Sequence, residues 1–352
     1  MQLVHQFMRP DGHRLSVNGD VTLSSSVLSF DFLSPPLPLD MAAATTKLLL
    51  SDLASTVESF TSNYIRPISD RPNLTEVQIS DGSIPHIDLH VLDLIKQIGQ
   101  ACQHDGFFQV KNHGIPETII NNMLSIAGAF FKLPESERLK SYSDDPSKSK
   151  RLSTSFNVNT EKEVVAEYCT SVRGLELKLL EAISESLGLQ RDYIDKALGK
   201  HGQHMALNYC PPCPQPDLTY GLPGHTDPNL ITVLLQDDVP RLQVLRTGKW
   251  FPVSPIPNTF IVNIGDQMQV LSNDLYKSVL HRALVNCDKE RISIPTFYCP
   301  SPDAVIAPAK DLIDERHLAV YKNFTYAEYY QKFWNGGLAA ECCLDLFKAS
   351  TA

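Results

Sequence analysis

Three side chains in the second half of the 352-residue chain have the types and spacing of a metal site. His225 and Asp227 are separated by a single residue. On a strand or its extended end, residues two apart project from the same face, so the imidazole and the carboxylate would lie side by side. His281 lies in a second strand-like run, residues 278–285. We predict that these three residues bind one divalent metal ion.

The number and type of these ligands narrow the chemistry. Two histidines and one carboxylate occupy one face of an octahedron and leave three positions open, which is the arrangement of non-haem Fe(II) oxygenases. A structural zinc would fill all four of its positions, but a catalytic zinc also uses three protein ligands, so zinc is the competing metal. A HxD pair alone is common and predicts little.

Arg291 and Ser293 follow ten residues after His281 and again share one strand face. Arginine stays charged when buried and presents a rigid fork to a carboxylate. Beside a metal with open positions, it indicates an anionic co-substrate. A 2-oxo acid fits, because its keto and carboxylate oxygens chelate iron while its far carboxylate reaches Arg291 and Ser293. The order HxD, His, RxS within one β-rich segment is much more specific than any of its parts.

The elements that position these residues are predicted to be short strands. From about residue 204 the apolar pattern has a period of two. Strands are expected near residues 204–209, 230–236, 242–246, 249–253, 259–264, 278–285 and 291–298. Many short, evenly spaced strands favour an antiparallel sandwich or jelly roll. The fold prediction is therefore mostly β with flanking helices, around a double-stranded β-helix (jelly-roll) core.

The rest of the chain is more mixed. Helical spacing is found at residues 91–104, 116–131 and 164–187 and from Thr325 onward, and short strands are expected at 84–89 and 106–110. The predicted organisation is a disordered leader at 1–40, an N-terminal arm at 41–83, a mixed region at 84–200, the jelly-roll core at 201–300 and a C-terminal helical segment at 301–352. His113 and His204 are interpreted as turn or core residues.

Composition excludes several classes of partner. Lys and Arg number 31 against 40 Asp and Glu, which gives a net charge of −9 and argues against nucleic acid and anionic membranes. No apolar run is long enough to cross a bilayer. Eight cysteines are too sparse for a disulfide scaffold and indicate reduced thiols. We expect a cytoplasmic monomer, with the nucleus as an additional location, and interpret Cys210 and Cys213 as buried thiols of a proline-rich turn.

Longer segments resemble the plant 2-oxoglutarate- and Fe(II)-dependent dioxygenases. The matching segments are residues 106–114, 208–216, 224–232, 263–267, 281–282 and 291–293. Within that family the chain is most similar to the downy-mildew-resistance-type oxygenases, on residues 142–146, 151–157 and 324–330. The resemblance implies hydroxylation of a small aromatic or phenolic plant metabolite, namely salicylate at C5 in defence and salicylate catabolism. Flavone synthase or flavanone hydroxylase activity is the alternative.

The same resemblance implies a role for each matching residue. Iron would be bound by His225, Asp227 and His281, and 2-oxoglutarate by Arg291 and Ser293, with O2 as oxidant and ascorbate in support. Phe297 would stack on the aromatic substrate. The other expected pocket residues are Asn208 and Cys210 beside the co-substrate, and Arg151, Ser153 and Phe156 in a loop bordering the substrate.

Two departures from the family pattern stand out. Cys210 replaces a tyrosine whose hydroxyl contacts the co-substrate, and losing that bond would cost about 1 kcal/mol. After Glu163 the chain continues directly with Val164, where the family has a few dozen further residues that include a strand. We therefore expect a jelly roll that lacks one strand. The alternative of another class is a catalytically impaired protein that binds without turnover.

Overall fold

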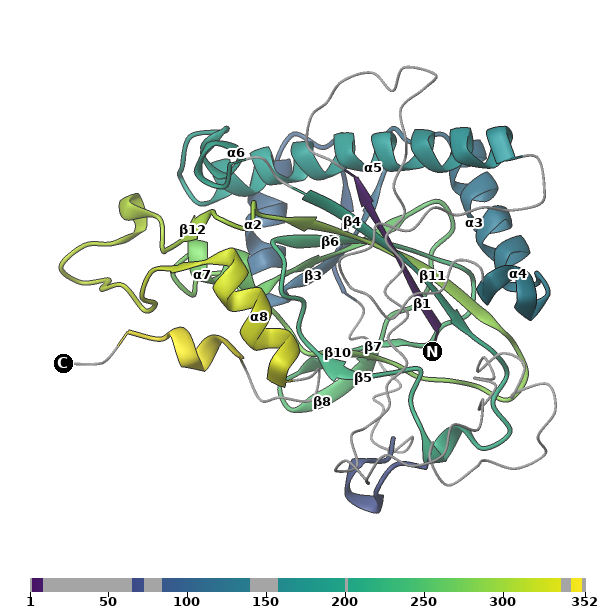
Figure 1. The fold of residues 1–352 in the computed structure, drawn as a ribbon. Coiled ribbons are helices and arrows are strands. Elements are labelled where there is room, and N and C mark those ends of the chain that lie inside the picture. The colour runs from purple at the N-terminus through teal and green to yellow at the C-terminus, as the bar shows by residue number, and fades with distance from the viewer. Residues whose placement is uncertain are drawn as a thin grey trace.

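Two β-sheets form the centre of the molecule in a computed structural model that describes residues 2–8, 65–72, 84–139, 158–199, 202–336 and 343–349. The larger sheet has seven strands and the smaller has four (Figure 1). The larger sheet runs in the order β1 (Gln2–Met8), β4 (Gly202–Cys210), β11 (Arg291–Cys299), β6 (Ile231–Gln236), β9 (Phe260–Ile264), β3 (Phe107–Lys111) and β2 (His86–Asp88). The smaller sheet runs β5 (Leu222–His225), β10 (His281–Ala283), β7 (Leu242–Arg246) and β8 (Lys249–Pro252).

Eight of these strands make a complete jelly roll. β4, β11, β6 and β9 are antiparallel neighbours in the larger sheet, and β5, β10, β7 and β8 are antiparallel neighbours in the smaller one. Two four-stranded antiparallel sheets are the architecture of this fold. The predicted mostly β fold with a jelly-roll core is therefore confirmed. The prediction that the core lacks a strand is wrong, because all eight core strands come from residues 202–299, after the gap.

The position where the family has a few dozen further residues, between Glu163 and Val164, lies within a helix instead. α5 (Val158–Ser186) continues without interruption through Glu163 and Val164. It begins six residues earlier than the predicted start at residue 164. Its buried side chains recur at spacings of three and four, as at Tyr168, Val172 and Leu175, so one face packs on the larger sheet.

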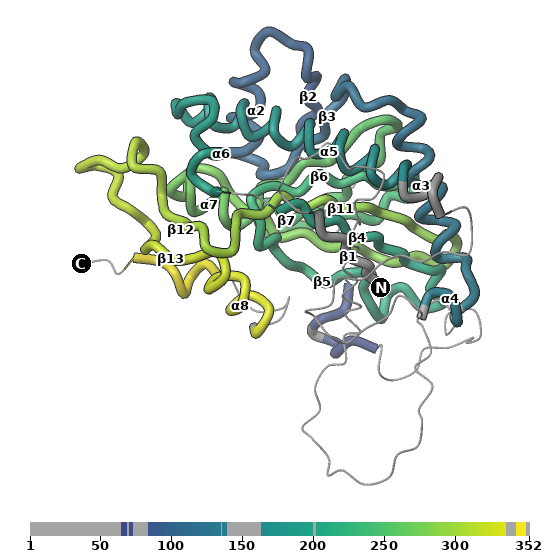
Figure 2. The backbone as a smooth tube through the Cα atoms, turned by 45° about the horizontal axis from the view of Figure 1, so that its top comes forward, coloured from purple at the N-terminus to yellow at the C-terminus, as the bar shows by residue number. Residues whose placement is uncertain are grey.

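Helices cover one face of the larger sheet (Figures 1 and 2). α2 (Leu94–His104), α3 (Glu117–Phe131) and α5 pack together on that face, and their buried residues form one cluster with those of the sheet. The remaining helices are α4 (Glu135–Leu139), α6 (Tyr193–Ala197), α7 (Asp266–Leu271) and α8 (Tyr326–Gly336), with 3-10 turns η2 (Ile68–Asp70), η4 (Pro216–Leu218), η5 (Lys310–Leu312) and η6 (Cys343–Phe347). Figure 2 shows α8 at one end of the sheets with β12 (Val305–Ile306) and β13 (Phe324–Thr325).

Strand alternation decides which residues face the interior between the sheets. In β11, Ile292 and Ile294 belong to the cluster shared with the helices. Successive residues of a strand point to opposite faces, so Arg291 and Ser293 face the other way, toward the smaller sheet. The same alternation turns Asn208 of β4 inward, because it directly opposes Ser293 in the ladder.

Two parts of the chain differ from expectation. Residues 2–8 of the predicted disordered leader form strand β1, which pairs antiparallel with β4 along its whole length (Figure 1). Without it, β4 would present an unpaired edge, and open edges readily accept another strand. Strand β5 was not among the predicted strands, because Leu222–His225 contains Pro223 and Gly224, which are unusual in strands.

The described cysteines are consistent with reduced thiols: none of them is in a disulfide, and Cys210 and Cys213 are both buried. Within the described residues, none of the helices combines the length and the apolar character needed to cross a bilayer.

Candidate active site

A cross-strand pair brings the two predicted imidazole ligands together. His225 is the last residue of β5, His281 is the first of β10, and the two are directly opposite in the ladder. Their ring centroids are 4.2 Å apart. Asp227 lies just beyond the end of β5, and its Oδ1 is 3.6 Å from Nε2 of His225 and 3.7 Å from Nε2 of His281. Among the described residues, these three form the one group with metal-ligand geometry.

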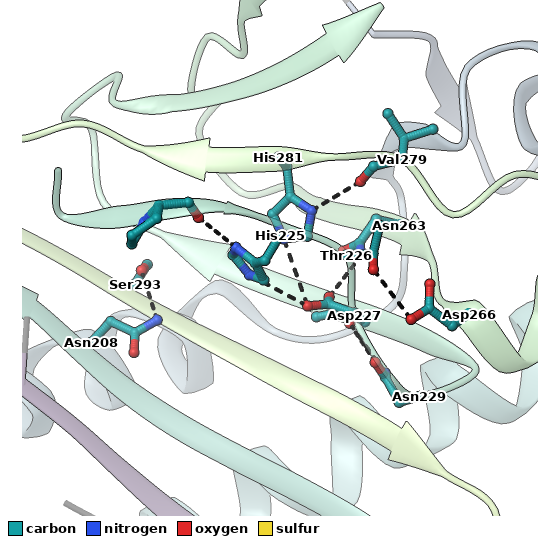
Figure 3. A network of polar contacts seen from close by, with 12 residues as sticks. Asn208, His225, Thr226, Asp227, Asn229, Asn263, Asp266, Val279, His281 and Ser293 are labelled. Atoms are coloured by element: carbon teal, nitrogen blue, oxygen red, sulfur yellow. Dashed lines mark hydrogen bonds and ion pairs between the residues drawn. The ribbon is translucent and has the colours of Figure 1, made fainter. Parts of the chain in front are cut away.

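Backbone carbonyls orient both imidazoles. Nδ1 of His225 lies 2.8 Å from the carbonyl oxygen of Pro223, and Nδ1 of His281 lies 3.2 Å from that of Val279 (Figure 3). A carbonyl can only accept, so each Nδ1 carries the proton. Each Nε2 therefore directs a lone pair toward the carboxylate, as a metal ligand requires.

The carboxylate of Asp227 is held by one oxygen only. Its Oδ2 accepts hydrogen bonds from the hydroxyl of Thr232 at 2.6 Å and the amide of Asn263 at 2.8 Å. The amide of Asn229 donates to Thr232 Oγ1 at 3.1 Å, which directs the hydroxyl proton to Asp227. Oδ1 is left to face the two imidazoles, so the group is arranged to bind a metal through one oxygen.

The loop after Asp227 is fixed to the start of α7. The amide of Asp266 donates to the carbonyl of Asp227 at 2.8 Å, and that of Gly265 donates to Leu230 at 2.8 Å. A Cβ at residue 265 would lie 2.2 Å from the carbonyl oxygen of Asn229. Only glycine permits this approach, so its presence in the Asn-Ile-Gly-Asp run is explained by the loop it contacts.

A second buried carboxylate supports the same loop. Oδ2 of Asp266 accepts from the hydroxyl of Thr226 at 3.2 Å (Figure 3). It also accepts from the hydroxyl of Tyr329, on α8, at 2.6 Å. Burial raises the pKa of Asp266 to about 6. The C-terminal helix is thereby connected to the residue between His225 and Asp227.

The protonation states suit metal binding at neutral pH. Burial, together with repulsion from His281, lowers the pKa of His225 to about 4. Burial acts to raise the pKa of Asp227, but the two imidazoles and the hydrogen bonds from Thr232 and Asn263 outweigh it, so the net shift is downward. A neutral imidazole and an ionised carboxylate are the forms that bind a metal. The donor set of two nitrogens and one oxygen on one side therefore fits Fe(II) and, less specifically, zinc.

Arg291 is a buried cation that forms no direct ion pair with a described carboxylate, although Asp237 lies near enough that its charge acts to raise the pKa of the guanidinium. Its side chain is 3% exposed, and within the described residues it forms no ion pair with a carboxylate. Nη1 donates to Ser293 Oγ at 3.0 Å and Nη2 to Gln236 Oε1 at 2.9 Å, while Nε has no partner. Burial lowers the pKa of the guanidinium. Buried charges are normally paired, so this arrangement fits an anionic ligand.

The other predicted co-substrate residues lie beside Arg291. Cys210 opposes Arg291 in the β4–β11 ladder, and Asn208 opposes Ser293, to whose hydroxyl its amide donates at 3.4 Å. Cys210 is buried, and its Sγ would lie 3.0 Å from a Cβ at Gly221. These residues form one polar group on the inner face of the larger sheet.

The predicted substrate residues are only partly described. Phe297 lies on the inner face of β11, half-buried, and directly opposes Thr232 on one side and His204 on the other. His204 is therefore a half-buried residue of a strand, as the predicted strand at 204–209 indicates, and it is neither the turn residue nor the fully buried core residue of the other interpretation. Arg151, Ser153 and Phe156 lie outside the described residues.

Sequence reasoning missed the residues that position the ligands. Thr232, Asn263, Asp266 and Tyr329 carry no ligand spacing of their own, although all four fall within the segments that resemble the plant dioxygenases. Gln236, which accepts from Arg291, lies outside those segments.

Comparison with known families identifies two regions. Residues 201–300 match the 2OG-Fe(II) oxygenase superfamily, and residues 84–178 match the family described as non-haem dioxygenase in morphine synthesis N-terminal.

Among curated relatives, Protein DMR6-LIKE OXYGENASE 2 of Arabidopsis thaliana is 58% identical over 347 residues, covering 88% of this chain and 100% of the relative. Since 88% of 352 residues is about 310, about 37 aligned positions of the relative have no counterpart here. This matches the few dozen residues expected to be absent. Flavanone 3-dioxygenase 2 of Oryza sativa subsp. japonica is 48% identical and covers 81% of this chain and 93% of the relative.

Among solved structures, JOX2 in complex with 2OG, Fe, and JA is similar with a TM-score of 0.75 and 33% identity, covering 84% of this chain and 96% of that one. Sequence, fold and site geometry agree, and the predicted use of Fe(II) and 2-oxoglutarate is confirmed. The chain belongs to the 2OG-Fe(II) oxygenase superfamily and is a 2-oxoglutarate-dependent dioxygenase.

Proposed function

We propose that this dioxygenase hydroxylates a small aromatic or phenolic metabolite, and that the substrate is salicylate, oxidised at C5. The observation that carries the proposal is the combination of the His225–Asp227–His281 group with the buried guanidinium of Arg291, which forms no direct ion pair with a carboxylate of the described residues. Their residue types match the two ends of 2-oxoglutarate: a metal for its 2-oxo acid group and a cation for its far carboxylate.

Each residue then has a defined task. The Nε2 atoms of His225 and His281 and Oδ1 of Asp227 would hold Fe(II). Bound Fe(II) supplies the chemistry that couples decarboxylation of 2-oxoglutarate to insertion of oxygen into the substrate. Arg291 and Ser293 fix the far carboxylate, with Asn208 bonded to Ser293. Burial of this group limits access of water to the reacting atoms.

The aromatic substrate is supported by Phe297. It opposes Thr232, whose hydroxyl binds the carboxylate of Asp227, and directly opposed side chains on a sheet lie about 5 Å apart. A ring stacked on Phe297 would therefore lie close to the metal. The relative named flavanone 3-dioxygenase 2 supports the alternative, a flavonoid substrate in the same pocket. We further propose that the enzyme acts as a cytoplasmic monomer in defence and salicylate catabolism.

Substrate-dependent turnover tests the proposal. Purified enzyme with Fe(II), 2-oxoglutarate and ascorbate in air should release succinate in step with 2,5-dihydroxybenzoate formed from salicylate, resolved from its 2,3-isomer by chromatography. His281→Ala should abolish both products, and His317→Ala, at an exposed position bonded to Asp314, should not. Coupling to naringenin but not salicylate would replace the substrate with the alternative. Turnover on neither, with iron and 2-oxoglutarate bound, would favour the non-enzymatic binding protein.

A further inference from the structure

Four residues form a row across the larger sheet. Asn263 of β9 opposes Thr232 of β6, Thr232 opposes Phe297 of β11, and Phe297 opposes His204 of β4. Directly opposed residues in an antiparallel sheet project from the same face. The row therefore runs along the interior surface that faces the smaller sheet.

One end of this row is part of the metal site. Thr232 and Asn263 both donate to Oδ2 of Asp227. Neighbouring strands are spaced by about 4.8 Å, so Phe297 lies about 5 Å and His204 about 10 Å from Thr232 across the sheet. A ring stacked on Phe297 thus has the metal ligand on one side and His204 on the other.

The orientation of His204 follows from its strand. The alternate positions Met205 and Leu207 are buried in the cluster shared with the helices, so His204 lies on the opposite face, with Asn208. Its ring extends along β4 over Gly202, where a Cβ would lie 3.3 Å from Nε2. His204 and Phe297 are both half-buried, unlike the fully buried Thr296 and Tyr298 beside Phe297.

We propose that His204 determines substrate specificity by binding the acidic substituent of the aromatic substrate. An imidazole N–H can donate to the oxygen of a carboxylate or phenolate, and hydrogen bonds to ionised groups are the strong ones. Within the row, His204 is the one ionisable side chain. Arg291, the nearest cation along β11, is six residues from Phe297 and is assigned to the co-substrate. The expected class is a ring bearing a carboxylate, presented away from the metal.

This inference rests on the proposed function. A pair of matched ligands distinguishes a failure of the role of His204 from a failure of the proposed reaction. Salicylate and salicylamide have nearly the same shape, but only salicylate carries a carboxylate. Binding to the enzyme with 2-oxoglutarate is measured by calorimetry and turnover by succinate release, for the wild type, His204→Gln and His317→Gln. The last variant makes the same change at an exposed site.

We expect His204→Gln to weaken salicylate binding about 10-fold or more, the loss typical of a hydrogen bond to a charged group. Its binding of salicylamide, its KM for 2-oxoglutarate and all constants of His317→Gln should stay within about twofold. Equal losses for salicylate and salicylamide, or no loss for salicylate, would overturn the role of His204. Wild-type enzyme that turns over neither ligand but binds salicylate in a His204-dependent manner would instead refute the proposed reaction and retain the role.

Discussion

At the scale of single residues, the metal site depends on groups that do not touch the metal. Thr232 is the clearest case, because its hydroxyl accepts from Asn229 and donates to Asp227. The pair of bonds fixes which carboxylate oxygen faces the imidazoles. Such outer partners of metal ligands usually contribute a factor of 10–100 in metal affinity.

Thr232→Val keeps the shape of the side chain and removes the hydroxyl. We expect metal affinity to fall by about 10–100-fold, because Asp227 loses one of the two bonds that orient it. Titration with Co(II), followed by its visible absorption, measures this without turnover. Thr170→Val, on the exposed face of α5, is the matched control and should bind Co(II) like the wild type. An unchanged affinity in Thr232→Val would show that Asn263 alone suffices.

Cys210 allows a second prediction at this scale. It lies opposite Arg291, where the plant dioxygenases that the chain resembles have a tyrosine. Restoring the hydroxyl with Cys210→Tyr should lower the KM for 2-oxoglutarate about fivefold, which corresponds to about 1 kcal/mol. Steady-state kinetics with varied 2-oxoglutarate measure it. Cys210→Ser changes the group without extending it and should give no such gain; an equal gain in both variants would contradict the explanation.

At the scale of elements, α5 carries a buried carboxylate against β4. Glu176 is fully buried, Oε2 accepts from the amide of Gln203 at 3.0 Å, and Oε1 has no partner. Burial raises the pKa of Glu176 well above its usual value, although Arg173 and Gln203 act in the opposite direction. The folded protein therefore keeps a proton that the unfolded chain releases above its ordinary pKa of 4.5.

Glu176→Gln should accordingly stabilise the protein more at high pH than at low pH. Below pH 4.5 the folded and unfolded states both hold the proton, so ionisation of Glu176 does not affect the free energy of unfolding. As the pH rises toward the raised pKa, only the unfolded state ionises, and the free energy of unfolding falls. The variant removes that loss. Its Tm should exceed the wild-type Tm at pH 8 and approach it at pH 5, by roughly 2–4 °C for each kcal/mol recovered.

Glu181→Gln provides the comparison for this helix. Glu181 is exposed on α5 and pairs with Arg191, so its loss should change Tm little at either pH. Equal Tm differences at pH 5 and pH 8 for Glu176→Gln would show that the carboxyl is not retained in its protonated form.

At the scale of the whole molecule, β1 closes the open edge of the larger sheet. The seven residues of β1 pair with Gln203–Tyr209 of β4, and β4 also carries Asn208, Cys210 and His204. We predict that deleting residues 1–8 makes amide exchange in β4 at least tenfold faster, because outward-facing groups of β4 lose their partners. Hydrogen exchange with mass spectrometry measures it. The eight core strands do not include β1, so the fold itself should persist.

Two proline variants provide the control. Neighbouring residues of an edge strand direct their N–H groups to opposite sides, so only one of Val4 and His5 donates to β4. One of the variants Val4→Pro and His5→Pro should therefore accelerate amide exchange in β4 as the deletion does, and the other should change the exchange rate little. If β4 exchanges equally in all forms, β1 does not protect this edge.

The sequence by itself determined the chemical groups and their approximate elements. Spacing alone predicts the HxD pair, His281 and the Arg291–Ser293 pair as site residues, because a period of two puts side chains on one face whatever the details of packing. Strand and helix positions were close for the same reason, since an apolar pattern reports which face is buried. The sequence also shows that the family's segment after Glu163 is missing, because the chain continues there directly with Val164.

Only the tertiary structure decided which strands pair, and therefore which side chains lie next to each other. The gap spares the jelly roll because all its strands lie later in the chain, and the leader supplies β1 because β4 offers an open edge. Thr232 and Asn263 reach Asp227, and His204 aligns with Phe297, through ladders between segments far apart in sequence. Side-chain hydrogen bonds of hydroxyls and amides produce no periodic pattern in a sequence. Strand register decides which of these side chains lie opposite each other, and a shift by one residue would separate them.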